Sequence, residues 1–297
     1  MNSLNVFKLK NGKTKLSFLP DYGGKISDLS FDGFDVFRPL STESIKLLKS
    51  AKGGNFPLVP FSNRIKNSKF HFNNTLYKLD ENKSVSPHSI HGHGYIGKWS
   101  IIDQTPSSAL ISYSHYPLKA GWPWAYEVKQ EINLEKSSCS IRLSIINKSN
   151  SSMPIGFGFH PFFNFNDNVT LEFDAEREWI GLPESFPNKT QNIKNNFNVK
   201  NGANLWKIEK TVCYENFKGN MKINWIDQQK SVTIEVDKIF NHLIVHVPKG
   251  GDYFCIEPVS HPTDGFNLAY KKIENIKNRI LLPNENISGL MKICFNN

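Results

Sequence analysis

The fold of this chain is most constrained by a period-two alternation of apolar and polar residues that recurs from one end to the other. Successive side chains of a strand point to opposite faces, so this alternation is typical of antiparallel strands buried on one face only. Helical periodicity is nearly absent. We therefore predict an all-β fold, a large antiparallel β-sandwich with few short helices. The clearest alternating stretches are 126–134, 141–145, 169–173, 221–225, 232–236 and 243–247.

Local signals predict two hairpins and one helix. Asp32-Gly33 and Asn73-Asn74 each separate two apolar runs, as the two-residue turn of a β-hairpin does. Thr42 to Lys49 is the helix candidate, because its apolar residues lie one turn apart behind an N-capping Ser41 or Thr42.

Nothing in the composition divides the chain. No compositional shift marks a domain boundary and no solenoid or propeller repeat is present, so we expect residues 1–297 to form one domain. The stretch from Gly181 to Gly202 is rich in Asn, Pro and Lys and is predicted to be a long surface loop or an excursion from the sheet. Loops of that length in a compact domain are often functional or mobile.

The net charge of +9 does not come from a basic motif. Only five residues are arginine, and the lysines are scattered singly, with no basic block of five or more. This pattern indicates a solvated surface, so we expect no nucleic-acid partner, although an anionic sugar derivative would still be attracted.

The cysteines and the chain start indicate a cellular compartment. The four cysteines are far apart and form no C-x-x-C motif, which predicts free thiols in a reducing cytoplasm. The first residues lack the charged and then apolar pattern of a signal peptide. No apolar run approaches the roughly 18 residues of a membrane span. We expect a cytoplasmic protein without membrane contact, either a monomer or a weak homodimer.

Polar residues gather in four clusters that interrupt the strand pattern. The first, residues 55–65, contains two prolines that hold an extended loop and ends in Asn63 and Arg64. An amide beside a guanidinium offers the donors and the acceptor that a hydroxyl-rich ligand needs. The same Asn-Arg-Ile triplet recurs at 278–280 in a lysine-rich setting, so the proline-rich approach is what distinguishes the first copy.

The second cluster, residues 88–99, carries three histidines between glycines. Their spacing is not that of a metal-binding helix, so we expect no metal here. Glycines allow close approach of backbone to a ligand, and Tyr95 and Trp99 could stack on a sugar face.

The third and fourth clusters each hold one group suited to proton transfer. His160 lies among aromatic residues in the stretch 156–163, where it is either a packed core residue or a working acid. Glu257 follows an apolar strand in the stretch 255–267 and precedes a proline. A lone Glu after a strand is usually exposed, but a crowded turn of prolines, a histidine and an aspartate favours a functional site.

Taken together and in this order, the four clusters resemble the aldose 1-epimerase, or mutarotase, family, and most closely its smaller bacterial branch. The shared segments are Pro-Phe-Ser-Asn-Arg-Ile, His-Gly-x-Gly with a following Trp, Gly-Phe-Gly-x-His-Pro-Phe-Phe and Glu-Pro-Val-x-His-x-x-Asp-x-Phe-Asn. The resemblance runs across most of the chain and implies a galactose mutarotase-like supersandwich with a sugar cleft on one concave face.

The resemblance also implies roles. It makes Glu257 the general base, His160 the general acid, and Asn63, Arg64 and His91 ligand-binding groups. One position departs from the pattern, because Tyr214 stands where the family usually has a sugar-binding Asp. We expect the neighbouring Glu215 to take over that contact, or the contact to be lost.

The implied activity is interconversion of the α and β anomers of a free hexose by acid–base ring opening and reclosure, with no cofactor and a monosaccharide as the only partner. One alternative is a hexose-6-phosphate 1-epimerase, in which Arg38 or a nearby lysine would reach the phosphate. A second is a carbohydrate-binding protein without activity, which the Tyr214 departure suggests. A glycosidase is a weaker alternative, since it needs a second carboxylate near Glu257, for which Glu215 is the candidate.

Overall fold

The alternating runs form the strands of two large sheets. The computed structural model describes residues 5–47, 52–117, 121–166, 168–181, 186–193, 202–205 and 210–296. The larger sheet has nine antiparallel strands and contains all the alternating stretches named above except 243–247. In spatial order its strands are β10 (Ser100–Gln104), β11 (Ser108–His115), β12 (Tyr126–Leu134), β13 (Ser138–Asn147), β27 (Asn286–Asn296), β23 (Lys230–Val236), β22 (Asn220–Trp225), β17 (Val169–Phe173) and β20 (Ala203–Asn204).

The second large sheet has eight strands and includes the two clusters that carry His160 and Glu257. Its central strand β25 pairs with three others, because both β15 and the short β16 lie along the edge opposite β24. The strands are β19 (Lys189–Asn192), β18 (Arg177–Ile180), β21 (Thr211–Glu215), β24 (His242–His246), β25 (Tyr253–Val259), β15 (Gly158–Phe159), β5 (Pro57–Leu58) and β16 (Phe162–Asn164).

Smaller elements complete the fold. The N-terminal strands form a four-stranded sheet, and three two-stranded ribbons carry loops around the second large sheet. Their bounds are β1 (Phe7–Asn11), β2 (Thr14–Leu19), β3 (Lys25–Phe31) and β4 (Phe34–Phe37), then β14 (Met153–Ile155) with β26 (Arg279–Leu281), β6 (Arg64–Ile65) with β9 (Ser89–Ile90), and β7 (Lys69–Phe72) with β8 (Thr75–Lys78). The helices are α1 (Thr42–Leu47) and α2 (Gly265–Tyr270), with 3-10 turns at Pro20–Tyr22, Lys66–Ser68 and Ile273–Asn275.

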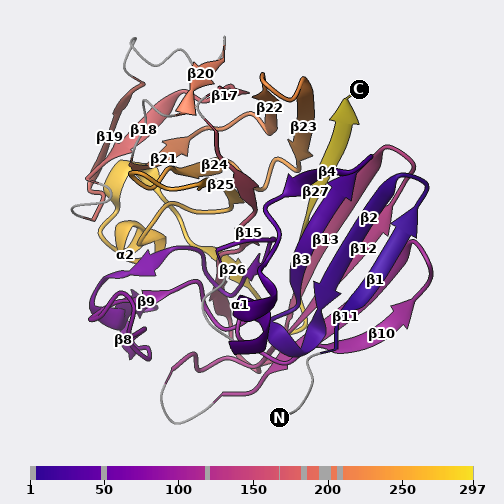
Figure 1. Ribbon diagram of the computed structural model, residues 1–297. Coiled ribbons are helices and arrows are strands. Elements are labelled where there is room, and N and C mark those ends of the chain that lie inside the picture. The colour runs from indigo at the N-terminus through magenta and orange to yellow at the C-terminus, as the bar shows by residue number, and fades with distance from the viewer. Residues whose placement is uncertain are drawn as a thin grey trace.

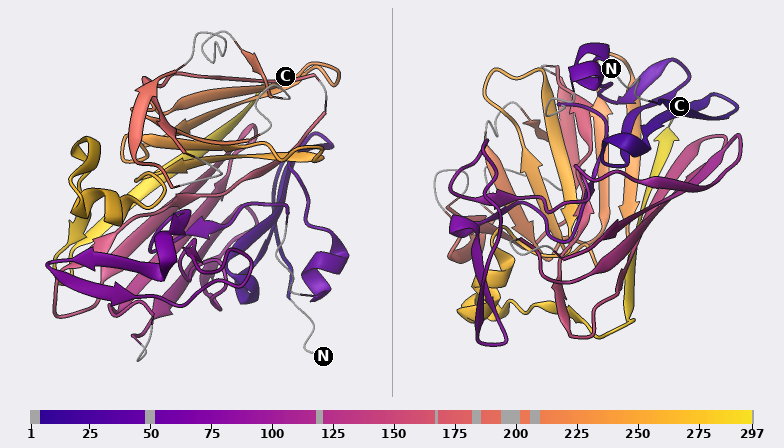
Figure 2. Two further views of the ribbon diagram at one scale, coloured as in Figure 1. Left: turned by 90° about the vertical axis from the view of Figure 1, so that its left-hand side faces the viewer. Right: turned by 90° about the horizontal axis from the view of Figure 1, so that it is seen from below.

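The nine-stranded sheet packs against both of the other large groups of strands. The four-stranded N-terminal sheet lies over its β11–β13 end, and β21, β24 and β25 lie over its other end (Figures 1 and 2). Side-chain contacts agree with both placements, since Gln130 on β12 donates a hydrogen bond to Gly24 O and Phe173 on β17 contacts Tyr214 on β21. The predicted sandwich of antiparallel sheets is confirmed.

Most local predictions are also confirmed. Hairpins turn at Asp32-Gly33 and at Asn73-Asn74. The predicted helix is present as α1, with the Ser41 hydroxyl accepting a hydrogen bond from the Ser44 N–H at 3.1 Å, as an N-cap does. Residues 48–51, at its expected end, lie outside the described residues.

Two details differ from the prediction. The stretch 181–202 is not loop throughout, because β19 lies within it and pairs with β18; residues 182–185 and 194–201 lie outside the described part. The helix α2 has no sequence signal, since six residues are too few to show helical periodicity. Within the described residues, no helix has the length and apolar character that crossing a membrane requires.

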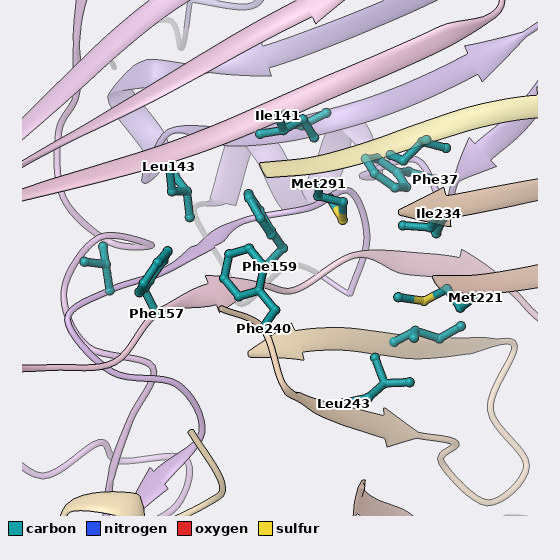
Figure 3. Close-up of a cluster of buried hydrophobic side chains, with 14 of the residues drawn as sticks. Phe37, Ile141, Leu143, Phe157, Phe159, Met221, Ile234, Phe240, Leu243 and Met291 are labelled. Carbon is teal, nitrogen blue, oxygen red and sulfur yellow. The ribbon is translucent and has the colours of Figure 1, made fainter. Parts of the chain in front are cut away.

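The core between the two large sheets is rich in aromatic rings. Ile141, Leu143 and Met291 enter it from the nine-stranded sheet, as Figure 3 shows. Phe240 lies at its centre, with its ring centroid 5.1 Å from that of Phe157 and 5.4 Å from that of Phe159. Close packing of this kind leaves little freedom to relax when a ring is removed.

Phe240→Ala is therefore expected to lower the free energy of unfolding by about 3–5 kcal/mol, because it leaves a cavity among buried rings. Tyr116→Ala is the control, since that side chain is 72% exposed and its removal should change stability by less than about 0.5 kcal/mol. Denaturant unfolding followed by tryptophan fluorescence measures both. Equal effects in the two variants would contradict the packing described here.

Candidate active site

Glu257 is presented to the site by the alternation of β25. Ile256 and Phe254 point into the core between the large sheets, so Glu257 and Cys255 point to the opposite face. The register extends this row across the sheet. Cys255 pairs with His246 on β24, and His246 pairs with Thr211 on β21, whose hydroxyl lies 2.9 Å from His246 Nδ1.

His160 reaches the same face from the glycine-rich stretch 156–163, directly after β15. Phe157 and Phe159 of this segment enter the core, and His160 faces the other way. The backbone N–H of His160 donates to the side-chain oxygen of Asn55 at 3.0 Å and to Phe56 O at 3.1 Å. Its ring packs against both Phe56 and Phe162, at centroid distances of 4.4 and 4.7 Å.

The two groups meet in a buried pair. His160 Nε2 lies 3.4 Å from Glu257 Oε1, and the two residues are 8% and 3% exposed. Within the described part of the chain, Glu257 Oε2 and His160 Nδ1 have no hydrogen-bond partner. Buried polar atoms without partners are costly, so these two are free to bind a ligand that brings hydroxyl groups.

Asn63 and His91 support one another from two different loops. Both have left-handed backbones, with φ of 54° and 62°. The N–H of Asn63 donates to His91 Nδ1 at 3.2 Å, and the N–H of His91 donates back to Asn63 O at 3.0 Å. Because Nδ1 accepts, the proton of the neutral imidazole is on Nε2, which leaves His91 as a hydrogen-bond donor.

These side chains line one cavity of about 160 Å³. Four residues of its wall, Ile90, His91, His160 and His246, also line a wider cavity of about 780 Å³ that adjoins it. The structure thus brings together five of the six predicted site residues. The lining of the smaller cavity consists of Asn63, Arg64, Ile90, His91, His160, Thr211, His246 and Glu257.

Burial controls the charge of the site. It raises the pKa of Glu257 from 4.5 to about 8, and it lowers the pKa of His160 well below 6.5, with smaller contributions from His91 and His246. It also lowers the pKa of His91 to about 3. At neutral pH the Glu257–His160 pair therefore holds one proton. Such a pair can give a proton at one atom and take one at another.

The cluster after β25 clamps the loop that carries Asn63 and Arg64. His261 Nε2 accepts a hydrogen bond from the Ser62 N–H at 3.1 Å, while its Nδ1 donates to Pro262 O at 2.8 Å. Three residues after His261, the N–H of Asp264 donates to Arg64 O at 3.0 Å. The His and Asp of this motif thus position the loop and do not line the cavity.

Gly156 is required beside this clamp. A Cβ at Gly156 would lie 1.9 Å from Cδ2 of His261, closer than atoms can approach. Gly156 therefore leaves space for His261, which holds the backbone of Ser62.

The sixth predicted residue, Glu215, lies elsewhere. It lines a separate cavity of about 770 Å³ together with Arg177, His242 and Glu274. Tyr214, at the position where the resemblance expects an aspartate, points into the core against Phe173 and is 2% exposed. The polar group that β21 presents to the Glu257 cavity is instead the hydroxyl of Thr211.

Thr211 and His246 are site residues that the sequence analysis does not identify. Each sits in an ordinary alternating strand, so no local motif marks it. The strand register is the signal that finds them, because it places both in one row with Cys255, two residues from Glu257.

The three histidines of the second cluster separate in the structure. Only His91 lines the Glu257 cavity. His93 stacks on His115 with ring centroids 4.5 Å apart, and His88 Nδ1 accepts a hydrogen bond from the Asn67 N–H.

Gly156→Ala tests the clamp. The added methyl should displace His261, release Ser62 and cost about 1–3 kcal/mol of stability, which denaturant unfolding measures. Gly12→Ala is the control, since no atom lies within 4 Å of a Cβ at that turn and the site is not involved. A Gly156→Ala variant as stable as the wild type would contradict the role given to His261.

Comparison with known proteins finds relatives in sequence and in fold. YphB of Escherichia coli K12, itself uncharacterized, is 24% identical over 269 residues, which cover 88% of this chain and 90% of YphB. A galactose mutarotase-like protein from Clostridium acetobutylicum has a TM-score of 0.82 at 20% identity over all of both chains. The GalM/aldose epimerase homologue from C. elegans has a TM-score of 0.83 at 17% identity over 99% of each chain.

The sequence profile of the family described as aldose 1-epimerase matches residues 5–294, nearly the whole chain. The profile therefore covers all four polar clusters and the sheets that carry them. The chain belongs to the aldose 1-epimerase family.

Proposed function

We propose that this protein is an aldose 1-epimerase that interconverts the α and β anomers of an aldopyranose, with Glu257 and His160 as the proton-transfer groups. The observation that carries the proposal is the buried pair itself, with His160 Nε2 3.4 Å from Glu257 Oε1 and one proton between them at neutral pH. Ring opening needs one group to take a proton and one to give a proton, and the pair has this composition.

Transfer of one proton from Glu257 to His160 converts the pair from its resting form to the form that can catalyse ring opening, the working pair. At rest the proton is on the Glu257 carboxyl, because burial disfavours both charges. Moving it to His160 leaves a carboxylate as base and an imidazolium as acid, with no change in the number of protons. A sugar whose hydroxyl groups donate to the carboxylate favours that form, since hydrogen bonds to an ionised group stabilise it.

Opening and reclosure then follow without a net change in the protein. Glu257 takes the proton of the anomeric hydroxyl, His160 gives its proton to the ring oxygen, and the bond between C1 and the ring oxygen breaks as the aldehyde forms. After rotation about the C1–C2 bond, the ring hydroxyl attacks the other face of C1. Its proton returns to His160, and Glu257 returns its own to the former aldehyde oxygen.

The other cavity residues serve to hold the sugar. Asn63 and Arg64 are positioned by His261 and Asp264, and His91 offers its Nε2 proton as a donor. The fixed positions of these binding residues matter, because holding a substrate against the catalytic groups also lowers the activation barrier.

The position of Glu215 weighs against hydrolysis of glycosides. That reaction needs two carboxylates across one sugar ring. In the described residues Glu257 is the only carboxylate that lines its cavity, and Glu215 lines another one. A binding protein without activity would not need a proton-carrying pair, so the pair favours the epimerase.

Glu257→Gln is expected to lower the enzymatic rate of anomer interconversion about 10²- to 10⁴-fold, because it removes one of the two proton-transfer groups. Stability should be kept or slightly improved, since the amide stays neutral and a buried ionisable group is removed. Polarimetry of fresh α-anomers, corrected for the spontaneous reaction, measures the rate, and thermal unfolding is the control. A folded variant that retains the wild-type rate on every aldose tried would overturn the assignment.

The rate should also fall as pH rises through about 8. Below that pH the pair holds one proton; above it Glu257 is ionised beside a neutral His160, and no acid remains to protonate the ring oxygen. The pKa of His160 lies well below 6.5, so no second loss is expected between pH 6.5 and 8. A rate profile recorded from pH 6 to 10 checks this. An enzymatic rate above pH 9 that equals the rate at pH 7 would contradict it.

A further inference from the structure

The wider cavity beside the catalytic pair has an unusual charge. Its wall includes three lysines, Lys25, Lys52 and Lys83, and within the described residues no aspartate or glutamate lines it. Lys52 and Lys83 are exposed at its rim, whereas Lys25 is only 3% exposed. A buried lysine is rare unless it is paired, so Lys25 requires an explanation.

Neutral groups hold Lys25 in place without neutralising it. Its Nζ donates a hydrogen bond to Tyr95 O at 2.6 Å and lies 3.8 Å from the ring centroid of Tyr22. Among the described residues no carboxylate forms an ion pair with it, and burial alone lowers its pKa to about 7. The ammonium thus has donor capacity to spare, since it carries three protons.

Arg38, the other cation considered for this role, is already engaged. Its guanidinium forms an ion pair with Asp252 at 2.6 Å. An arginine satisfied by a carboxylate is a poorer partner for an incoming anion than a lysine that lacks one. Lys25 is therefore the better candidate.

Phe56 connects Lys25 with the catalytic pair. Its ring centroid lies 5.6 Å from Lys25 Nζ and 4.4 Å from the ring centroid of His160. The ammonium and the imidazole are at most the sum of these two distances apart. Lys25 is therefore within reach of a substituent at the far end of a hexose whose anomeric carbon is at His160.

Tyr95 adds a second polar group at the Lys25 end. Its hydroxyl accepts a hydrogen bond from Asn82 Nδ2 at 2.9 Å, which leaves the hydroxyl proton for another acceptor. Lys25 and Tyr95 both line the wider cavity, so one anionic group there could accept from both.

We propose that the substrate is an aldose with an anionic group at the end remote from the anomeric carbon, and that Lys25 binds this group. The inference rests on the proposed function, and it identifies the substrate class of the same site. A carboxylate or a phosphate would supply the missing counter-charge, and the ammonium serves either as a point charge. We therefore favour an anionic aldose as the substrate, in place of the neutral hexose that the sequence alone suggests.

The test compares glucose, glucuronate and glucose 6-phosphate as substrates of the wild type and of Lys25→Met. The wild type should convert at least one anionic sugar with a kcat/KM about tenfold or more above that of glucose, and Lys25→Met should lower this preference by about tenfold or more. Lys10→Met is the matched control, because Lys10 is exposed on β1 and outside the cavity. Its preference should equal that of the wild type.

The outcomes separate the two proposals. If the wild type accelerates none of the three sugars or galactose, the epimerase assignment fails. If it converts glucose with the same kcat/KM as the anionic sugars, or if Lys25→Met retains the preference for an anionic sugar, the epimerase assignment stands and the role of Lys25 is overturned. Preference for glucuronate over glucose 6-phosphate, or the reverse, identifies the anion as a carboxylate or a phosphate.

A measurement on the wild type alone covers the case in which Lys25→Met does not fold. Near pH 8, above the pKa of about 7 of Lys25, an anion that binds the ammonium must draw a proton onto it. Calorimetry in two buffers of different ionisation enthalpy should show more proton uptake with the preferred anionic sugar than with glucose. Equal uptake with both sugars would overturn the inference.

Discussion

The alternation of strands β24 and β25 is the constraint on which the rest of the structure depends. Each strand buries one row of side chains against the nine-stranded sheet and presents the other row to a second, smaller cluster. A shift of the register by one residue would turn Glu257 into the core and Ile256 into the cavity. The apolar residues that stabilise the sandwich therefore also determine which side chains face the cavity of Glu257.

The same burial sets the chemistry of the site. Removing Glu257 and His160 from water disfavours both charges, so that the pair keeps a single proton near neutral pH. The aromatic rings of Phe56 and Phe162 around His160 supply this environment and orient the imidazole. In a low-dielectric site without ligand, a carboxylate beside an imidazolium is costly. In the proposed reaction the hydroxyl groups of the bound sugar offset that cost.

Buried histidines play three distinct parts around this pair. In the proposed reaction His160 exchanges protons, whereas His91 is held neutral as a donor by Asn63 and His261 fixes the backbone of Ser62 without entering the cavity. Sequence alone does not distinguish them, because the difference lies in which atoms each ring meets. The wider cavity, which Lys25 lines, adjoins this polar site. Its positive charge suits the proposed substrate, a sugar that carries a negative charge.

The sequence by itself determined the class of fold, the hairpins and most of the site. Period-two alternation predicts half-buried strands wherever it occurs, and the motifs around His160 and Glu257 are local in the chain, so both can be recognised without coordinates. It also located Asn63, Arg64 and His91, which the structure brings to one cavity. These features depend on short stretches of chain.

Only the tertiary structure decided which residues on different strands share a cavity. Strand register placed Thr211 and His246 in the row beside Glu257, and it directed Glu215 to a separate cavity. Folding of the N-terminal strands placed Lys25 in the wall of one cavity with His160 and His246, which lie far along the chain. The physical reason is that pairing between strands distant in sequence is set by the packing of whole sheets, which no local pattern encodes.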